Sequence, residues 1–313
     1  MKVLLIGSVS SSAAALRGLL RGGLPPAAVC GLHPRHAEAV SDYHDLGPPA
    51  REAGIPYVAF DKVTEPAVRA LIERTAPDWL LVIGLSQLVP GGLRALARRG
   101  SIGFHPTMLP EGRGRAPVAW TILLGRPAAA NLFFLTDEPD AGDIIAQRPV
   151  EVRPDDYAAD LIARTNVVLE DMVAELCPAL ASGQVPRRPQ DHARATWYPR
   201  RRPEDGLIDW TRPNEEIYRL VRAVSRPYPG AFTFAGGRKL IVWRALPQGV
   251  GADRSAPGTV LGALEGRPLV RTGDGALLLT EWAWPESPAG DLVAGMVLGC
   301  SQAGGPASGV PGR

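Results

Sequence analysis

The sequence predicts an α/β protein with a mostly parallel, doubly wound sheet, followed by a smaller part rich in β-strands. Two observations carry this prediction. Over roughly the first 200 residues, short apolar runs alternate with segments of helical periodicity, and further along the pattern changes to short strands separated by Gly and Pro. Strand–helix alternation is typical of parallel sheets covered by helices, whereas closely spaced short strands are typical of β-barrels.

The predicted strands of the first part are continuous apolar runs, as expected where a parallel sheet is buried on both faces. They cover residues 2–7, 27–32, 57–60, 79–83, 101–105 and 131–136. Between them, apolar residues recur at helical spacing, and serines can cap the first helix. The predicted helices cover residues 12–21, 66–75, 93–98, 117–124 and 157–180. This pattern predicts a Rossmann-like sheet, in which ligands bind beyond the carboxyl ends of the strands.

The second part has one predicted helix and a series of short strands bounded by Gly and Pro. The helix covers residues 215–224, and the strands cover 231–234, 239–243, 258–261, 268–271 and 276–282. This pattern predicts a small OB-like barrel.

Four segments follow from these elements. We expect a first domain over 1–185, a linker rich in Pro and Arg over 186–203, and a β-rich domain over 204–300. Residues 301–313 contain almost no core-forming side chains, so we expect a disordered tail there.

Composition excludes several classes of function. The chain of 313 residues has a net charge of +2 and no clustered basic surface, so a nucleic-acid partner is not expected. No apolar run reaches membrane-spanning length, and the N-terminus lacks the long apolar stretch of a secretory signal. Cys30, Cys177 and Cys300 are too few and too widely spaced for a disulfide framework, which predicts a reducing, cytoplasmic location.

Common cofactor motifs are also missing. The residues after the first strand read GSVSSS, which is neither the glycine fingerprint of nicotinamide-binding folds nor a P-loop. His33 and His36 form the closest histidine pair, but no carboxylate or thiolate stands at metal-ligand spacing beside them. We therefore predict no metal site.

The most informative region is 101–147, where two polar side chains follow predicted strands. His105 ends one strand, and Asp140 lies in the acidic loop DEPDAGD after the next. If the carboxyl ends of these strands are adjacent, the imidazole and the carboxylate meet, which suits general acid–base catalysis. The plainer alternative is a packed histidine and an aspartate that serves only a turn.

The same region resembles the motifs of formyltransferases that use formyltetrahydrofolate. In that family, N-x-H-x-S-L-L-P is followed by R-G-x-x-P and later by a loop of the D-x-G-x-D-[TAS]-G-D type. Here His105 begins HPTMLP, Arg113 begins RGRAP, and Asp140 begins DAGD. Further on, IDW and RAVSRPYPGAF, which begins at Arg222, resemble the start of the C-terminal domain shared by sugar N-formyltransferases and methionyl-tRNA formyltransferases.

The resemblance implies an enzyme that uses 10-formyltetrahydrofolate as cosubstrate and needs no metal. His105 would donate to the oxyanion or shuttle a proton, and Asp140 would orient His105 and accept the amine proton. The residues implied to line the pteridine site are Leu85, Ser86, Gln87, Leu88, Val89, Asp137, Glu138 and Pro139. Those implied at the substrate are Ser8, Ser10, Arg113 and Arg115, although the serines can equally cap the first helix and the arginines can pair with nearby acids.

One family residue is missing. Two positions before the histidine the family has Asn, an amide donor to the oxyanion, and this chain has Gly103. Losing such a donor costs on the order of 10²–10³ in turnover. Asn131 is a candidate replacement; the alternatives are transfer of a different one-carbon or acyl group, and a folate-binding relative with weak or no turnover.

The preferred acceptor is an amino sugar nucleotide, because RGRAP resembles that branch and arginine suits phosphate recognition. N-hydroxyornithine of siderophore biosynthesis and methionyl-tRNA are the other candidates, and a polyanionic tRNA fits the near-neutral charge less well. The apolar C-terminal region around Trp282, Trp284 and residues 293–298 would form either a homodimer interface or the core of its own domain.

Overall fold

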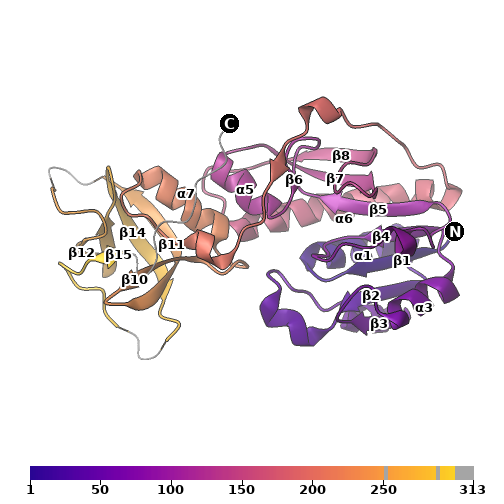
Figure 1. Ribbon diagram of the computed structural model, residues 1–313, viewed down its shortest axis with the longest axis horizontal. Helices are drawn as coiled ribbons and strands as arrows, with labels where there is room; N and C mark the ends of the chain where they lie inside the picture. Colours follow the sequence, from indigo (N-terminus) through magenta and orange to yellow (C-terminus); the bar gives the residue numbers. More distant parts are fainter. Residues whose placement is uncertain (250–252, 287–289, 300–313) are drawn as a thin grey trace. The chain divides into compact units, whose positions relative to one another are not determined.

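The structure is a computed structural model that describes residues 1–249, 253–286 and 290–299 (Figure 1). The predicted disordered tail, 301–313, lies outside the described residues. The chain divides into two compact units. The first comprises Met1–Thr121, Pro127–Val152 and Asp160–Pro199, and the second comprises Ile122–Arg126, Arg153–Ala159 and the described residues from Arg200 onward.

The first unit contains a seven-stranded sheet in the order β3-β2-β1-β4-β5-β7-β8. The five strands that pair in parallel are β1 (Val3–Gly7), β2 (Ala28–Leu32), β3 (Tyr57–Phe60), β4 (Trp79–Val82) and β5 (Gly100–His105). The last two strands, β7 (Ala128–Phe134) and β8 (Ile144–Val150), pair antiparallel. The predicted mostly parallel, Rossmann-like sheet is therefore confirmed, with an antiparallel hairpin at one edge.

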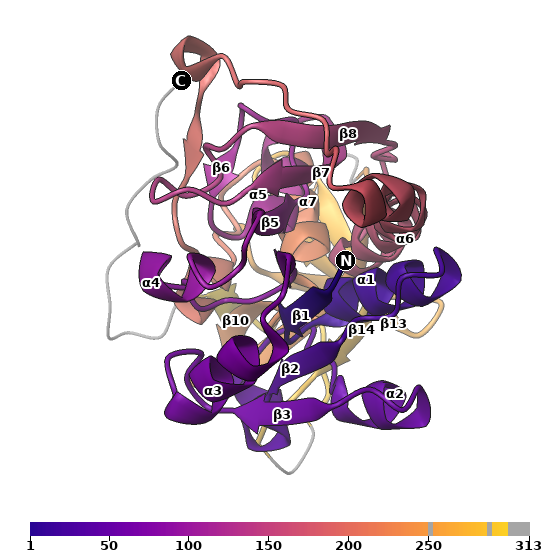
Figure 2. The same cartoon turned by 90° about the vertical axis from the view of Figure 1, so that its right-hand side faces the viewer.

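Helices cover both faces of this sheet (Figure 2). On one face lie α1 (Ser10–Arg21) and α6 (Ala158–Ser182), which approach so closely that a Cβ on Gly18 would lie 2.6 Å from the Glu170 carbonyl oxygen. On the other face α3 (Pro66–Thr75) and α4 (Gly91–Arg94) cover buried strand residues such as Leu4 and Leu80. The first unit also contains α2 (Gly47–Glu52) and the beginning of α5 (Pro117–Leu124), whose residues from Ile122 onward belong to the second unit.

The region expected to be a linker, 186–203, is in large part packed within the first unit, which extends to Pro199. Arg188 pairs with Ile144 at the start of β8, and β9 (Trp197–Tyr198) pairs with the short strand β6 (Arg113–Gly114). We call residues 188–198 the 188–198 segment. Its contacts are made by scattered residues rather than by a periodic element, and for this reason its composition resembles that of a linker.

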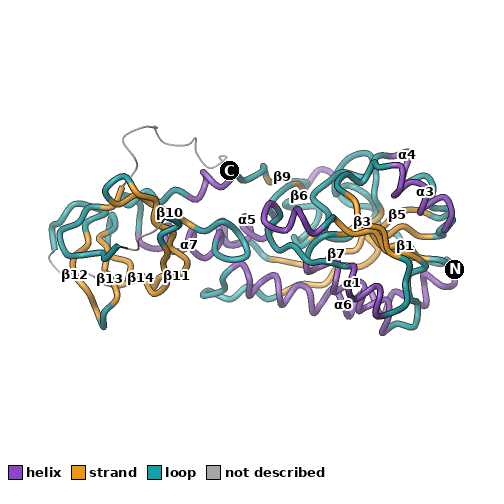
Figure 3. Tube along the Cα trace, turned by 90° about the horizontal axis from the view of Figure 1, so that it is seen from below, coloured by secondary structure: helices purple, strands orange, loops and turns teal. Residues whose placement is uncertain are grey.

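The second unit combines helix α7 (Asn214–Val224) with an antiparallel sheet, and Figure 3 shows these strands in orange and α7 in purple. The sheet order is β12-β13-β14-β11-β10-β15. The strands are β10 (Ala231–Ala235), β11 (Arg238–Gln248), β12 (Val260–Leu264), β13 (Arg267–Arg271), β14 (Ala276–Ala283) and β15 (Leu298–Gly299). The two edges meet, because Thr259 bridges Val297 and the Leu298 N–H donates to the Gly258 carbonyl at 2.8 Å. The predicted β-rich domain is thus a curled, barrel-like sheet.

Candidate active site

The imidazole of His105, at the end of β5, is buried and contacts protein groups through both nitrogens. Its Nε2 lies 2.8 Å from the Gly112 carbonyl oxygen. A carbonyl only accepts hydrogen bonds, so this contact assigns a proton to Nε2. Its Nδ1 lies 3.6 Å from Oδ2 of Asp140. The second nitrogen is therefore the one through which His105 can exchange a proton with the carboxylate.

Asp140 is held by contacts on both its side chain and its backbone. Its Oδ2 accepts from the Gly114 N–H at 2.9 Å, and its carbonyl oxygen accepts from Gln190 Nε2 at 2.8 Å. Its φ of 55° lies in the left-handed region, which costs a non-glycine residue roughly 1–2 kcal/mol. Such a conformation persists where the surroundings over-determine it, and the contacts to Gly114 and Gln190 do so here.

The predicted proximity of the two residues therefore holds, but the reason given for it from the sequence was wrong. We expected two adjacent carboxyl ends of parallel strands. Instead β7 runs antiparallel to β5, so that its last residue, Phe134, lies opposite Ile102, whereas His105 lies opposite Asn131. The loop 135–143 must then run back toward His105 over a distance of about 10 Å, at 3.3 Å per residue along β5. Asp140 reaches the histidine from a hairpin loop.

Asn131 is not available as a replacement donor to an oxyanion. It is fully buried, and its Nδ2 donates to the backbone carbonyls of His105, at 2.7 Å, and of Thr107. Its Oδ1 accepts from Gln147 Nε2, which also donates to the Leu109 carbonyl at 2.8 Å. The amide hydrogens of Asn131 therefore already have partners within the protein. Through these bonds Asn131 holds the backbone at and after His105 in place.

The position of the missing family residue is filled by hydrophobic side chains. A Cβ on Gly103 would lie 2.6 Å from Leu135 Cδ2 and 3.0 Å from Phe133 Cζ. Phe133 is buried in the small cluster with Leu109 and Ile144, and Leu135 packs against that cluster. The space beside Gly103 is thus already occupied by apolar atoms.

Arg113 serves the protein rather than a ligand. Its side chain is only 1% exposed. Its Nη2 donates to Gln190 Oε1 at 2.8 Å and its Nη1 to Glu138 at 3.2 Å, and the guanidinium lies over the Trp197 ring. The sequence placed Arg113 at the substrate, but these protein partners occupy its donors, and we therefore correct that expectation.

Arg115 differs from Arg113 because it is exposed and its Nη1 donates to the Ser86 carbonyl at 3.0 Å. It joins the first of the two predicted pteridine-lining regions, 85–89, to the residue that follows β6, the strand in contact with His105 and Asp140. In the first region Leu88 is 75% exposed, whereas Gln87 is bound to the Val63 N–H and the Asp61 carbonyl.

The second pteridine-lining region, 137–139, is exposed and is connected to its surroundings by ion pairs. Asp137 pairs with Arg94 at the end of α4, and Glu138 pairs with Arg113. Pro139 follows and is exposed. The two predicted pteridine segments are therefore both attached to β6 through Arg113 and Arg115.

Ser8 and Ser10 lie at the start of α1 and are committed to protein contacts. The buried Ser8 donates its hydroxyl to the Gly84 carbonyl at 3.0 Å. Ser10 donates to Asp42 Oδ2 at 2.5 Å and accepts from Asn166 Nδ2 at 2.7 Å. Burial raises the pKa of the Asp42 carboxyl, while the hydrogen bonds from Ser10 oppose that rise. Neither hydroxyl accepts from a backbone N–H of the helix, so neither serine caps it; the hydroxyl that accepts from the Ser8 and Val9 N–H groups belongs to Ser12.

The residues that sequence reasoning missed are Gln147, Gln190 and Thr196, which bind backbone groups of the loops around His105 and Asp140. No sequence signal identifies them, because their partners are distant along the chain.

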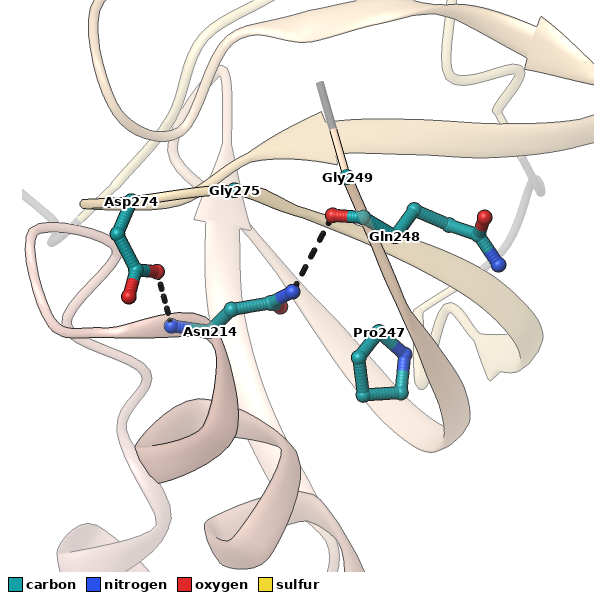
Figure 4. A pocket seen from close by; sticks show the side chains of 6 residues that line it. All are labelled: Asn214, Pro247, Gln248, Gly249, Asp274 and Gly275. Carbon is teal, nitrogen blue, oxygen red and sulfur yellow. Dashed lines mark hydrogen bonds between the residues drawn. The ribbon is translucent and has the colours of Figure 1, made fainter. Parts of the chain in front are cut away.

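A hollow in the second unit contains none of the predicted site residues (Figure 4). It is lined by Asn214, Pro247, Gln248, Gly249, Asp274 and Gly275. The Asn214 backbone N–H donates to Asp274 at 2.7 Å, and its side chain donates to the Gln248 carbonyl at 3.3 Å. Within the described ranges, no helix is long and apolar enough to cross a membrane, and no group of three His, Cys, Asp or Glu side chains could hold a metal.

Solved structures share this fold. HypX from Aquifex aeolicus in complex with tetrahydrofolic acid aligns with a TM-score of 0.63 at 20% identity, over 91% of this chain but only 44% of HypX. The N-formyltransferase from Helicobacter canadensis in complex with folinic acid and dTDP-3-aminofucose aligns with a TM-score of 0.62 at 13% identity, over 90% of this chain and 100% of that one. Methionyl-tRNA formyltransferase from Clostridium thermocellum aligns with a TM-score of 0.58 at 18% identity, over 92% and 100%. The chain thus spans less than half the length of HypX.

Two family models match most of the sequence. The formyl transferase model matches residues 1–174, which include His105 and Asp140, and the model of the formyl transferase C-terminal domain matches residues 201–292. On these matches, the chain belongs to the formyl transferase family of enzymes.

Proposed function

We propose that this enzyme transfers the formyl group of 10-formyltetrahydrofolate to a primary amine of a small molecule, with His105 and Asp140 as catalytic residues. The observation that carries the proposal is the pair formed by the buried His105 and the partly buried Asp140, with Nδ1 and Oδ2 3.6 Å apart, in a chain that belongs to the formyl transferase family. A pair of titratable side chains at a place where a ligand can bind is typical of active sites.

Exposed residues of the two predicted pteridine segments suit a folate. The exposed Leu88 offers an apolar contact to a flat ring, and residues 137–139 are also exposed. The HypX structure contains tetrahydrofolic acid and the Helicobacter canadensis structure contains folinic acid, which supports the same class of cosubstrate here.

In the proposed reaction, the amine nitrogen forms a bond to the formyl carbon as the bond from that carbon to N10 of the cosubstrate breaks. One amine proton must leave, and N10 must gain a proton. Asp140 accepts the amine proton and passes it to Nδ1 of His105 while Nε2 stays on Gly112, and this proton is then delivered to N10 as the bond between the formyl carbon and N10 breaks. The buried position strengthens these charge interactions relative to water.

The proposed acceptor is an amino sugar nucleotide. Support comes from the full-length alignment with an N-formyltransferase whose structure contains dTDP-3-aminofucose, and from Arg115, an exposed cation suited to a phosphate. Arg113 adds nothing to this argument because its donors are used within the protein.

A second candidate is a folate-binding relative with altered or lost chemistry. It is favoured by one observation, the packing of Leu135 and Phe133 where the family has its asparagine side chain. In this reading the cosubstrate binds, but no amine in the panel below accepts the formyl group.

The test is a calorimetric titration with 10-formyltetrahydrofolate, followed by measurement of tetrahydrofolate release with amino sugar nucleotides and N-hydroxyornithine as acceptors. His105→Ala is the catalytic variant, and His33→Ala is the matched control because His33 lies after β2, outside the pair. Release that depends on an acceptor and is lost only in His105→Ala supports the proposal. Binding without release supports the second candidate, and absence of binding contradicts both.

A further inference from the structure

The 188–198 segment lies between the two family matches, which end at residue 174 and resume at residue 201. It nevertheless contacts Asp140 directly and His105 through one intermediate residue, Gly112. Gln190 binds the backbone of the loop that carries Asp140, and Thr196 binds the backbone of the strand that accepts from His105. The segment is therefore tied to both residues of the pair.

The side-chain amide of Gln190 is 6% exposed and is fully bonded. Its Nε2 donates to the carbonyls of Asp140, at 2.8 Å, and Gly142, at 2.7 Å. Its Oε1 accepts from Arg113 Nη2 at 2.8 Å and Nε at 3.3 Å. Guanidinium groups only donate and carbonyls only accept, so the orientation of this amide is fixed by its partners.

Thr196, another residue of the 188–198 segment, binds the peptide group that joins Gly112 to Arg113 at the start of β6. The Arg113 N–H donates to the Thr196 carbonyl at 2.9 Å, and the Gly112 carbonyl, on the opposite edge of the same planar peptide group, accepts from His105 Nε2. The Gly112 N–H donates to Thr196 Oγ1 at 2.8 Å. Any displacement of Thr196 is thus passed to the histidine contact.

The next two N–H groups along the chain also face opposite sides. The Gly114 N–H points to Asp140 Oδ2, and the Arg115 N–H points to the Tyr198 carbonyl at 3.0 Å. Alternate backbone groups of a strand face opposite sides, so one side of β6 is bound by the 188–198 segment while the other side holds the catalytic pair.

We propose that the 188–198 segment is part of the catalytic apparatus and that Gln190 is a positioning residue for Asp140, with Thr196 positioning the Gly112 carbonyl for His105. The inference rests on the proposed function for its role in turnover. The left-handed backbone of Asp140 gives Gln190 its importance, because two donated hydrogen bonds, one of them to Asp140 itself, hold the loop in that conformation.

The first test variant is Gln190→Glu. A carboxylate in this place still accepts from Arg113, but its second oxygen faces the carbonyls of Asp140 and Gly142 and cannot donate to them. We expect kcat/KM to fall at least about tenfold, because two hydrogen bonds of about 1 kcal/mol each are lost. We also expect the imidazole ¹⁵N chemical shifts of His105 to change, which a loss of fold stability alone would not produce in folded protein.

The second variant is Thr196→Val, which is similar in shape, exposed, and removes only the hydroxyl bond to the Gly112 N–H. We expect a smaller fall in kcat/KM, roughly threefold, since one hydrogen bond of about 0.5–1.5 kcal/mol is lost. Gln184→Glu is the matched control for the change of charge, because Gln184 is exposed and lies outside the 188–198 segment.

Folded Gln190→Glu protein with wild-type kcat/KM and unchanged His105 signals would overturn the proposal. If that variant does not fold, unchanged activity and unchanged signals in Thr196→Val would overturn it instead. Wild-type protein without turnover would contradict the proposed function but not this inference, because the ¹⁵N signals still report whether the segment positions His105. Changes in both variants and none in Gln184→Glu are the expected result.

Discussion

Leu135 lies where a side chain on Gly103 would project, with its Cδ2 2.6 Å from the ideal Cβ position. Gly103 lies in β5, and Leu135 directly follows β7, the strand that pairs with β5. The Leu135 N–H donates to the Ser101 carbonyl at 2.8 Å. Glycine and leucine are therefore complementary at this point. The absence of the family asparagine is matched by a neighbour that fills its space.

We expect Gly103→Asn to destabilise the protein by roughly 1–3 kcal/mol, because a larger side chain must displace Leu135 in a packed region. In a Leu135→Ala background the same substitution should cost less, since the obstructing atoms are gone. The measurement is the free energy of unfolding in urea for the four members of this double-mutant cycle. An equal cost in both backgrounds would show that Leu135 does not limit the position.

Asn131→Asp should destabilise the protein by about 3 kcal/mol or more. The substitution places a carboxylate oxygen against the carbonyls of His105 and Thr107, where an amide donor now stands, and buries a charge. Thermal and urea unfolding measure the effect. Asn214→Asp is the matched control in the second unit, where the side chain donates one hydrogen bond of 3.3 Å, and it should cost clearly less. Similar costs for the two variants would contradict the role of Asn131.

Replacing Arg113 and replacing Arg115 should have different effects on the free energy of unfolding and on the KM of the acceptor. Arg113→Lys is expected to lower the free energy of unfolding by roughly 2–4 kcal/mol, because a lysine cannot reproduce the contacts to both Gln190 and Glu138. Arg115→Ala should change stability by less than about 1 kcal/mol, as expected for an exposed residue, and should raise the KM of a phosphate-bearing acceptor. Unfolding curves and KM values for both variants decide the matter, and a stable Arg113→Lys with raised KM would return Arg113 to the substrate site.

Stability should fall at alkaline pH. Burial raises the pKa of the Cys30 thiol from 9.0 to about 12, and burial together with the charge of Asp45 raises the pKa of the Tyr57 phenol. Both groups are neutral when protonated and their pKa values are raised in the folded state. Their contribution is therefore fully present below about pH 9 and is lost as the pH rises towards 12.

The expected slope is up to about 1.4 kcal/mol per pH unit for each group. Urea unfolding between pH 8 and pH 11 measures it, and Cys30→Ala should give a shallower decline than the wild type. Identical slopes for the two proteins would exclude the thiol as a cause.

Much of the architecture could be predicted because most long strands of the first unit are largely apolar runs and its long helices have an apolar face. The direction of β7 could not, because residues 131–136 read equally well as a parallel or an antiparallel strand. The second strand of the hairpin, β8, contains Arg148 and Pro149 and lacks a strand pattern. These edge features depend on tertiary contacts that no local pattern records.

The residues of the candidate site likewise divide into those that the sequence could indicate and those that it could not. The proximity of His105 and Asp140 could be predicted, and their residue types and their motif suggest acid–base chemistry. Gln190 and Asn131 could not, because an amide in a segment without periodicity carries no signal until its backbone partners are known. Arg113 was misjudged for a related reason: the sequence does not distinguish an arginine that meets a ligand from one that is enclosed by protein.

Asp140 lies in the hairpin loop between β7 and β8. The length of that loop therefore sets the distance between the Asp140 carboxylate and His105. The loop 135–143 begins and ends on neighbouring strands, so adding a residue leaves the sheet and its helices in place but moves the carboxylate by about 3.3 Å. That displacement is comparable with the 3.6 Å that separates Asp140 from His105. The number of residues between Phe134 and Ile144 therefore sets the distance between the carboxylate and the imidazole, and we expect a single insertion there to separate Asp140 from His105 while the protein stays folded.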